Sequence, residues 1–250
     1  MTSKKENQIL FFEKESPMRR LPIELNRPQL LFLDAIRFSI EMASFSQLRL
    51  LATLAKISEK RDGLSDEEKM LDQISALQDA WNIVDSSFRL RCLVGSVPYM
   101  KKNTPAVQSF VRATAQVPAM RNLIQHLDTE MKQLIEGDHS AWGSLCWAVV
   151  TDAKNCIIES WQFIPGTSFS GDKPHIVNPL GRLFKREIDH IELHAGEHRL
   201  SLSDVMEAIR FFGERLEDAL VGHFDGKHTS ISDVLMAVTF QGNKPNNALD

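Results

Sequence analysis

The feature that most constrains the fold is a change in the spacing of apolar residues at Gly143. Before it, from Met70 to Cys92, apolar residues recur at alternating steps of three and four, which is typical of one face of an α-helix. After it, two short apolar runs, 145–150 and 157–164, flank a group of turn residues, which is typical of a β-hairpin. We therefore predict an α+β fold, with an N-terminal helical bundle followed by a small antiparallel sheet and a C-terminal helix.

Start and stop signals divide the helical part of the chain. A first helix follows Pro28 and ends near residues 61–63, Arg-Asp-Gly. Ser65 and Glu68 form a capping-box pattern that predicts the start of a second, long helix. Pro118 opens a later helix, whose apolar stripe continues until near Gly137.

The part of the chain after the first hairpin mixes loops, strands and one helix. Residues 165–181 are rich in Gly, Pro, Ser and Asn and predict a long loop. Residues 188–194 and 199–202 predict a second hairpin around Gly196, and Ser203 is expected to cap a helix that runs to Leu220. Residues 231–240 are compatible with either a short helix or a short strand.

The length and composition predict a soluble globular protein with a full core, since the chain has 250 residues, of which 43% are hydrophobic and 25% charged. We expect four parts along the chain. They are a flexible arm over residues 1–27, a helical region over 28–137, hairpins and a helix packed on that region over 138–221, and a linker and tail over 222–250.

Cysteine usage and the N-terminus indicate the compartment. The three cysteines, Cys92, Cys146 and Cys156, are odd in number and lie in apolar segments, which favours buried thiols over a disulfide framework. The apolar run 9–12 is too short for a signal peptide or a membrane span. We therefore expect a cytoplasmic protein that does not enter the membrane.

Charge is distributed unevenly along the chain. The formal net charge is −4, yet residues 81–126 carry six basic residues and one acid, Asp85, so this segment is +5 and the remainder −9. Such a segment is either a solvated or partner-facing surface or a surface that contacts the phosphate backbone of RNA. The residues considered for RNA contact are Arg89, Lys101 and Lys102.

The most suggestive short sequence is Arg-Asn-Leu-Ile-Gln-His at residues 121–126. The guanidinium of Arg121 offers a planar fork that matches phosphate oxygens, and the imidazole of His126 exchanges protons near neutral pH. Arg121 falls in the first turn after Pro118, where unpaired backbone amides and the helix dipole favour an anion. By chance, at most roughly one chain in ten of this length and composition would contain such a spacing with Asn, Asp or His after the arginine.

Helical geometry complicates a site made from these residues. Five residues at about 100° each place Arg121 and His126 roughly 140° apart, so the arginine must reach around the helix or the site must combine two chains. Asn122 and His126 share a face, and on the preceding long helix Asp85 and Arg89 belong to a polar row. If the two helices pack side by side, these polar groups converge, with Asp85 as a supporting residue.

Residues 121–126 resemble the motif of the HEPN (higher eukaryote and prokaryote nucleotide-binding) superfamily of α-helical ribonucleases. The resemblance covers the helical portion of the chain and implies a metal-independent endoribonuclease of the toxin or phage-defence kind, without cofactor. It also implies a homodimer in which two motifs form one cleft, and a ribose 2′-hydroxyl that attacks the scissile phosphate. By this resemblance Arg121 holds the phosphate, His126 transfers protons and Asn122 orients the phosphate or the histidine.

Other interpretations of the same residues stay open. Residues 121–126 could be an ordinary exposed helix face, with Arg121 paired to Asp128 or to solvent and His126 free. The protein would then be a non-catalytic helical interaction or regulatory protein, whose partner could be an antitoxin or another protein. The chain has none of the sequence motifs of phosphate-binding loops, nucleophile elbows or dinucleotide-binding folds.

Two further sets of residues are expected to be structural. His190, His194 and His198 repeat every fourth residue, but Gly196 and the strand pattern argue against a helix that would align them, so we expect no metal site. Three tryptophans lie beside the first hairpin, and we expect them to pack in the sheet core rather than to stack on bases. They are Trp142, Trp147 and Trp161.

Overall fold

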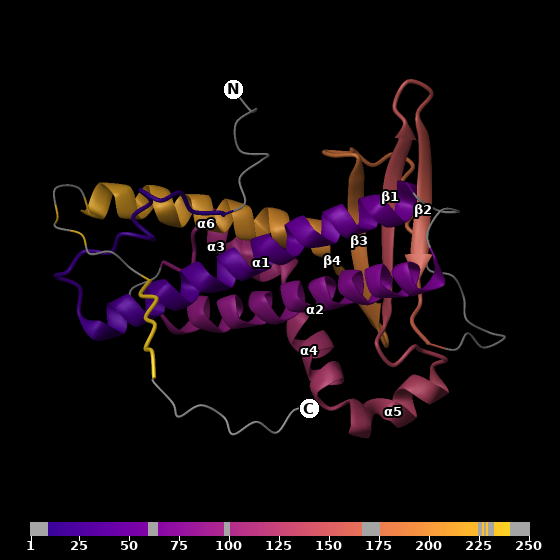
Figure 1. Ribbon diagram of the computed structural model, residues 1–250, viewed down its shortest axis with the longest axis horizontal. Helices are drawn as coiled ribbons and strands as arrows, with labels where there is room; N and C mark the ends of the chain where they lie inside the picture. The colour runs from indigo at the N-terminus through magenta and orange to yellow at the C-terminus, as the bar shows by residue number, and fades with distance from the viewer. Residues whose placement is uncertain are drawn as a thin grey trace, which may run out of the picture.

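Two long antiparallel helices form the base of the fold in the computed structural model (Figure 1). They are α1 (Arg27–Glu59) and α2 (Asp66–Ser96), and ion pairs between Lys56 and Asp72 and between Arg49 and Asp79 fix their antiparallel alignment. The capping box at the start of α2 is confirmed, because the hydroxyl of Ser65 accepts from the backbone amide of Glu68 while the Glu68 carboxylate accepts from the amide of Ser65. The structure describes residues 10–59, 65–97, 101–166, 176–224, 227, 229 and 233–240.

Shorter helices complete the helical layer. α3 (Pro105–Ala113) packs on α6 (Leu202–Phe224), where the rings of Phe110 and Phe212 stack with centroids 5.6 Å apart. α4 (Val117–Gln125) packs against α2, and α5 (Leu127–Glu136) follows it (Figure 1).

The prediction of one continuous helix from Pro118 to Gly137 is wrong, because the chain breaks between α4 and α5 at His126 (φ −117°, ψ 34°). The carbonyl of His126 accepts the backbone amides of Thr129 and Glu130, which begins a new helix in a new direction. The turn also leaves most of the apolar stripe of α5 uncovered, since Leu134 is its one buried side chain. Sequence periodicity misses such a break because residues on both sides keep the helical spacing.

Four antiparallel strands form a sheet in the order β2-β1-β3-β4. Both predicted hairpins are confirmed, as is the predicted α+β class. The strands are β1 (Ser144–Asp152), β2 (Ile157–Phe163), β3 (Ile188–Ala195) and β4 (His198–Ser201).

Gly143, where the apolar spacing changes, is required at the entry to the sheet. It has φ +75°, and a Cβ at this position would lie 2.1 Å from the backbone oxygen of His194. Only glycine fits both the positive φ and the close approach of β3. The sequence change therefore coincides with a backbone constraint.

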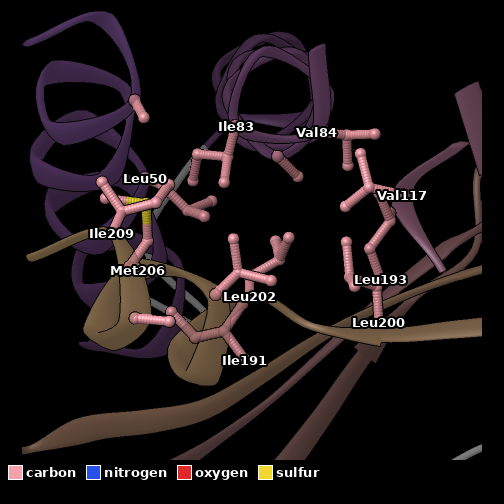
Figure 2. Packing of buried hydrophobic residues seen from close by; sticks show 14 of the residues in the cluster. Leu50, Ile83, Val84, Val117, Ile191, Leu193, Leu200, Leu202, Met206 and Ile209 are labelled. Atoms are coloured by element: carbon pink, nitrogen blue, oxygen red, sulfur yellow. The ribbon is translucent and has the colours of Figure 1, made fainter. Parts of the chain in front are cut away.

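A single hydrophobic core lies between the helices and the inner face of the sheet. Figure 2 shows side chains from α1, α2, α6 and the sheet that point toward one another, with Leu50, Ile83, Ile191 and Ile209 among them. Trp147 is buried, stacks on Trp161 with centroids 5.9 Å apart, and donates from Nε1 to the hydroxyl of Ser58 on α1. These two tryptophans pack as expected.

Trp142 departs from the expectation that all three tryptophans lie in the sheet core. Its side chain is half-exposed, and its backbone oxygen accepts a hydrogen bond from the Trp81 indole at 3.2 Å. It precedes β1, so no facing strand covers it.

The described part of the N-terminal arm is not free of the fold. Phe12, Met18 and Leu21 are buried in the core, and the backbone amides of Phe11 and Phe12 donate to the carboxylate of Glu41 on α1. The described part of the expected flexible arm, residues 10–26, is therefore packed, and residues 1–9 lie outside the described residues.

Two smaller predictions are corrected. Cys146 is buried as expected, but Cys92 and Cys156 are exposed, because one lies on the outer side of α2 and the other in the β1–β2 turn. The cap of α6 is Ser201 rather than Ser203: the Ser201 hydroxyl accepts from the Asp204 amide at 3.2 Å, while that of Ser203 accepts from Ile191.

None of the helices in the described part of the chain has the length and apolar character needed to cross a bilayer. Residues 233–240, part of the segment expected to be a short helix or strand, form neither. The predicted loop 165–181 lies partly outside the described residues.

Candidate functional site

The contact of α4 with α2 holds Arg121 on three sides. Its Nε donates to Asp85 Oδ1 at 3.0 Å, one terminal nitrogen donates to Gln125 Oε1 at 2.8 Å, and the guanidinium lies over the Phe88 ring, 4.2 Å from the centroid. Of the residues expected to converge here, Asp85 and Arg89 lie together with Arg121, whereas Asn122 and His126 make no side-chain hydrogen bond to α2 in the described part of the chain. Arg121 pairs with Asp85 and not with Asp128, the partner considered for an ordinary helix face.

Asp85 joins two arginines. Its second carboxylate oxygen accepts from Arg89, one helical turn further along α2. Two guanidinium groups share one carboxylate, which leaves this part of the surface with an excess positive charge. The side chain of Arg89 is largely solvent-exposed, whereas that of Arg121 is three-quarters buried.

His126 lies at the end of α4 toward which the Arg121 side chain runs. Gln125, which accepts a hydrogen bond from Arg121, is the last residue of α4, and His126 follows it directly. The His126 imidazole is exposed and makes no hydrogen bond within the described ranges. Gln125 is therefore the residue through which the Arg121 side chain reaches the end of α4 that His126 follows.

Asn122 is exposed and lies one turn before His126, whose backbone amide donates to the Asn122 carbonyl. Its side chain lines a cavity of about 460 Å³ between α4, α5 and the β3–β4 turn. Arg121 and His126 do not line this cavity, so one chain does not enclose the three residues in one cleft.

The basic loop residues lie further along α2. Lys102 donates from Nζ to the carbonyl of Gly95 at 2.9 Å, and Lys101 is exposed. Gly95 is ten residues beyond Asp85, which corresponds to about 15 Å of helix. The structure therefore brings Arg89 to Arg121 but leaves the two lysines as a separate basic group on the same helix.

No similarity identifies the chain. Searches of family models, curated proteins and solved structures give no match. The resemblance of residues 121–126 to the HEPN motif thus stays a prediction from sequence.

The three histidines of the second hairpin are separated by the strand geometry. His194 contacts Glu192 on the same strand, with 3.3 Å between Nε2 and Oε2, and His198 lies across the turn, where it lines the cavity beside His139. Within the residues the structure describes, no group of three His, Cys, Asp or Glu side chains is arranged to hold a metal ion.

A charged cluster around Glu192 was missed by sequence analysis. The Glu192 carboxylate is buried and accepts two hydrogen bonds from Arg199, at 2.6 and 2.7 Å, and one from Arg182 at 3.3 Å. Burial alone would raise the pKa of Glu192, but the bonds from His194 and Arg199 and the arginine charge together lower it to about 2. Its position between Ile191 and Leu193 in a strand predicts that Glu192 faces away from these apolar residues, so the sequence carries no signal for its burial.

Cys146 lies beside this cluster and is unsuited to be a nucleophile. Burial, together with the nearby Glu192 charge, raises the pKa of its thiol to about 12. Cys146 and Glu192 are paired neighbours on β1 and β3. The cluster is therefore an ion pair network on the sheet, without an activated thiol.

Proposed function

We propose that the protein is a metal-independent endoribonuclease of the toxin or phage-defence kind, in which Arg121, Asn122 and His126 are the catalytic residues. The observation that carries the proposal is the fixed guanidinium of Arg121 at the His126 end of α4. An arginine positioned before substrate arrives binds phosphate without first ordering its side chain. Its remaining terminal nitrogen has no hydrogen bond within the described part of the chain.

The proposed reaction is an internal transfer at phosphorus. The ribose 2′-oxygen attacks the phosphate, the bond to the 5′-oxygen of the next nucleotide breaks, and the products are a 2′,3′-cyclic phosphate and a 5′-hydroxyl. One imidazole removes the proton of the 2′-hydroxyl and a second, protonated imidazole gives a proton to the leaving oxygen. Arg121 binds the phosphate oxygens, whose negative charge grows during the attack.

A homodimer supplies the second imidazole. His126 is exposed rather than enclosed, so a second copy placed against this surface brings another His126 and excludes water. Asn122 then orients the phosphate or a histidine, and Arg89, Lys101 and Lys102 contact the RNA backbone on either side.

The experiment is RNA cleavage in a buffer that contains a chelator, with Arg121→Ala and His126→Ala beside the wild type. We expect each variant to cut at least about 100-fold more slowly, because His126→Ala removes a proton-transferring group and Arg121→Ala removes a group that stabilises the developing charge. Arg112→Ala and His223→Ala remove exposed residues of the same types elsewhere and serve as matched controls. No cleavage by the wild type, or equal cleavage by all five proteins, would overturn the proposal.

A second candidate is a non-catalytic interaction protein, which one observation favours. Large apolar side chains on the outer face of α1 are half-exposed and lack a covering element within the described residues. Apolar surface of this kind marks sites of protein contact. An inert wild type in the cleavage assay would leave this candidate as the function.

A further inference from the structure

The outer face of α1 carries a row of exposed apolar side chains, which we call the α1 stripe. The steps of seven, four and three between its members place them on one side of the helix. Their exposed fractions are 59% for Leu31, 49% for Phe38, 48% for Met42 and 46% for Phe45. The opposite side of α1 supplies its buried core residues, so the α1 stripe is not part of the core.

A second exposed apolar surface lies near the C-terminus. Residues 234–240, Val-Leu-Met-Ala-Val-Thr-Phe, contain no charged residue and form neither helix nor strand; we call them the apolar tail. The exposed fraction is 99% for Leu235, 82% for Met236 and 87% for Phe240. A segment of this composition has high β propensity and leaves its backbone free to pair.

An ion pair between Arg37 and Asp233 links the edge of the α1 stripe to the start of the apolar tail. Arg37 donates two hydrogen bonds to the carboxylate of Asp233, the residue before the apolar tail. The same guanidinium lies over the ring of Phe38, 4.3 Å from its centroid. Because the Arg37 side chain is only 3% exposed, this contact fixes the start of the tail at the edge of the α1 stripe.

The two surfaces also match in length. Seven extended residues span about 23 Å at about 3.3 Å each. The helix from Leu31 to Phe45 spans about 21 Å at about 1.5 Å per residue. The apolar tail does not cover the α1 stripe of its own chain, since the large apolar side chains of both surfaces are exposed.

We infer that the apolar tail of one copy covers the α1 stripe of a second copy, and the reverse, in a two-fold symmetric dimer. One contact between two copies covers both kinds of apolar surface, and the anchor at Asp233 directs each tail. With roughly 200 Å² for a whole phenylalanine ring, the exposed parts of Phe38, Phe45 and Phe240 in two copies come to roughly 700 Å². That is over half of the ~1,200 Å² at the lower end of stable interfaces.

The α1 stripe and the apolar tail do not include Arg121 or His126, so this contact is a different one from the dimer of the proposed function. Its test is the oligomeric state of the full chain by sedimentation across a range of concentrations. We expect a dimer whose dissociation constant rises at least about 100-fold in Met42→Glu, on the stripe, and in Met236→Glu, on the tail. Met70→Glu changes an exposed methionine on α2, outside both surfaces, and is the matched control.

A charge exchange tests whether the two surfaces touch. We expect Met42→Lys to weaken the dimer alone and to recover most of its affinity when combined with Met236→Glu. Circular dichroism checks that each variant is folded. A wild type that is monomeric throughout the range, or a dimer that none of the stripe and tail changes weakens, would overturn the inference.

Discussion

The Nε of Arg121 on α4 donates a hydrogen bond to Asp85 Oδ1 on α2 at 3.0 Å. This contact joins two helices that are separated by the basic loop and α3 in the sequence. It also sets the direction of the guanidinium relative to the end of α4, where His126 lies. The proposed activity depends on this positioning, so the role of Asp85 can be tested apart from the reacting groups.

Asp85→Asn is expected to lower the rate of RNA cleavage at saturating substrate by about tenfold, because the guanidinium loses a charged partner and its fixed orientation. The free energy of unfolding should fall by no more than about 1 kcal/mol, since the pair is partly exposed. Asp128→Asn removes the carboxylate considered as an alternative partner and should change neither quantity. A larger effect from Asp128 than from Asp85 would contradict the geometry.

Gly143→Ala is expected to destabilise the protein by about 3 kcal/mol or more, because the new methyl group collides with the backbone oxygen of His194, which cannot move without breaking the β1–β3 pairing. Gly166 also has a positive φ, but a Cβ there meets nothing within 4 Å. Gly166→Ala should therefore cost only about 1 kcal/mol. Urea unfolding compares the two, and equal losses would show that backbone φ alone matters.

The buried Glu192 predicts a specific acid sensitivity. Its folded-state pKa of about 2 lies below the ordinary value of 4.5, so its contribution to stability is fully present above about pH 4.5 and is lost as the pH falls toward 2. In Glu192→Gln, the free energy of unfolding should be lower at neutral pH and should fall less steeply between pH 4.5 and 2. Glu24→Gln, at an exposed position, should follow the wild type.

Thiol reactivity distinguishes the three cysteines. Cys92 and Cys156 are exposed and should react with an aromatic disulfide reagent in the native protein at pH 8. Cys146 should react only after unfolding, because its pKa is raised to about 12 and its side chain is buried. Three equally fast thiols in the folded chain would contradict the burial of β1.

The local part of the fold could be predicted from sequence because local spacing determines it. The change at Gly143 predicts both the end of the helices and the start of the sheet, and the Ser65 and Glu68 pattern predicts the start of α2. Both depend on the spacing of neighbouring residues. The contact between Arg121 and Asp85 was not predicted in this form, because the polar row expected to face Asp85 was that of Asn122 and His126.

Long-range packing could not be predicted in the same way. Phe12 belongs to a short apolar run in an otherwise polar arm, and its backbone amide donates to Glu41 of α1, 29 residues away. The burial of Glu192 needs Arg182 and Arg199 from other segments, and the break at His126 leaves no mark in the apolar spacing. Such features arise from contacts that a single segment does not encode.

The most direct measurement of the central proposal uses a labelled oligonucleotide with one ribonucleotide among deoxynucleotides, incubated with the full chain in chelator. The account predicts one cut, after the ribonucleotide, leaving a 2′,3′-cyclic phosphate, and at least about 100-fold slower cutting by His126→Ala. An intact oligonucleotide with the wild type, or the same cut at the same rate with His126→Ala, would contradict it.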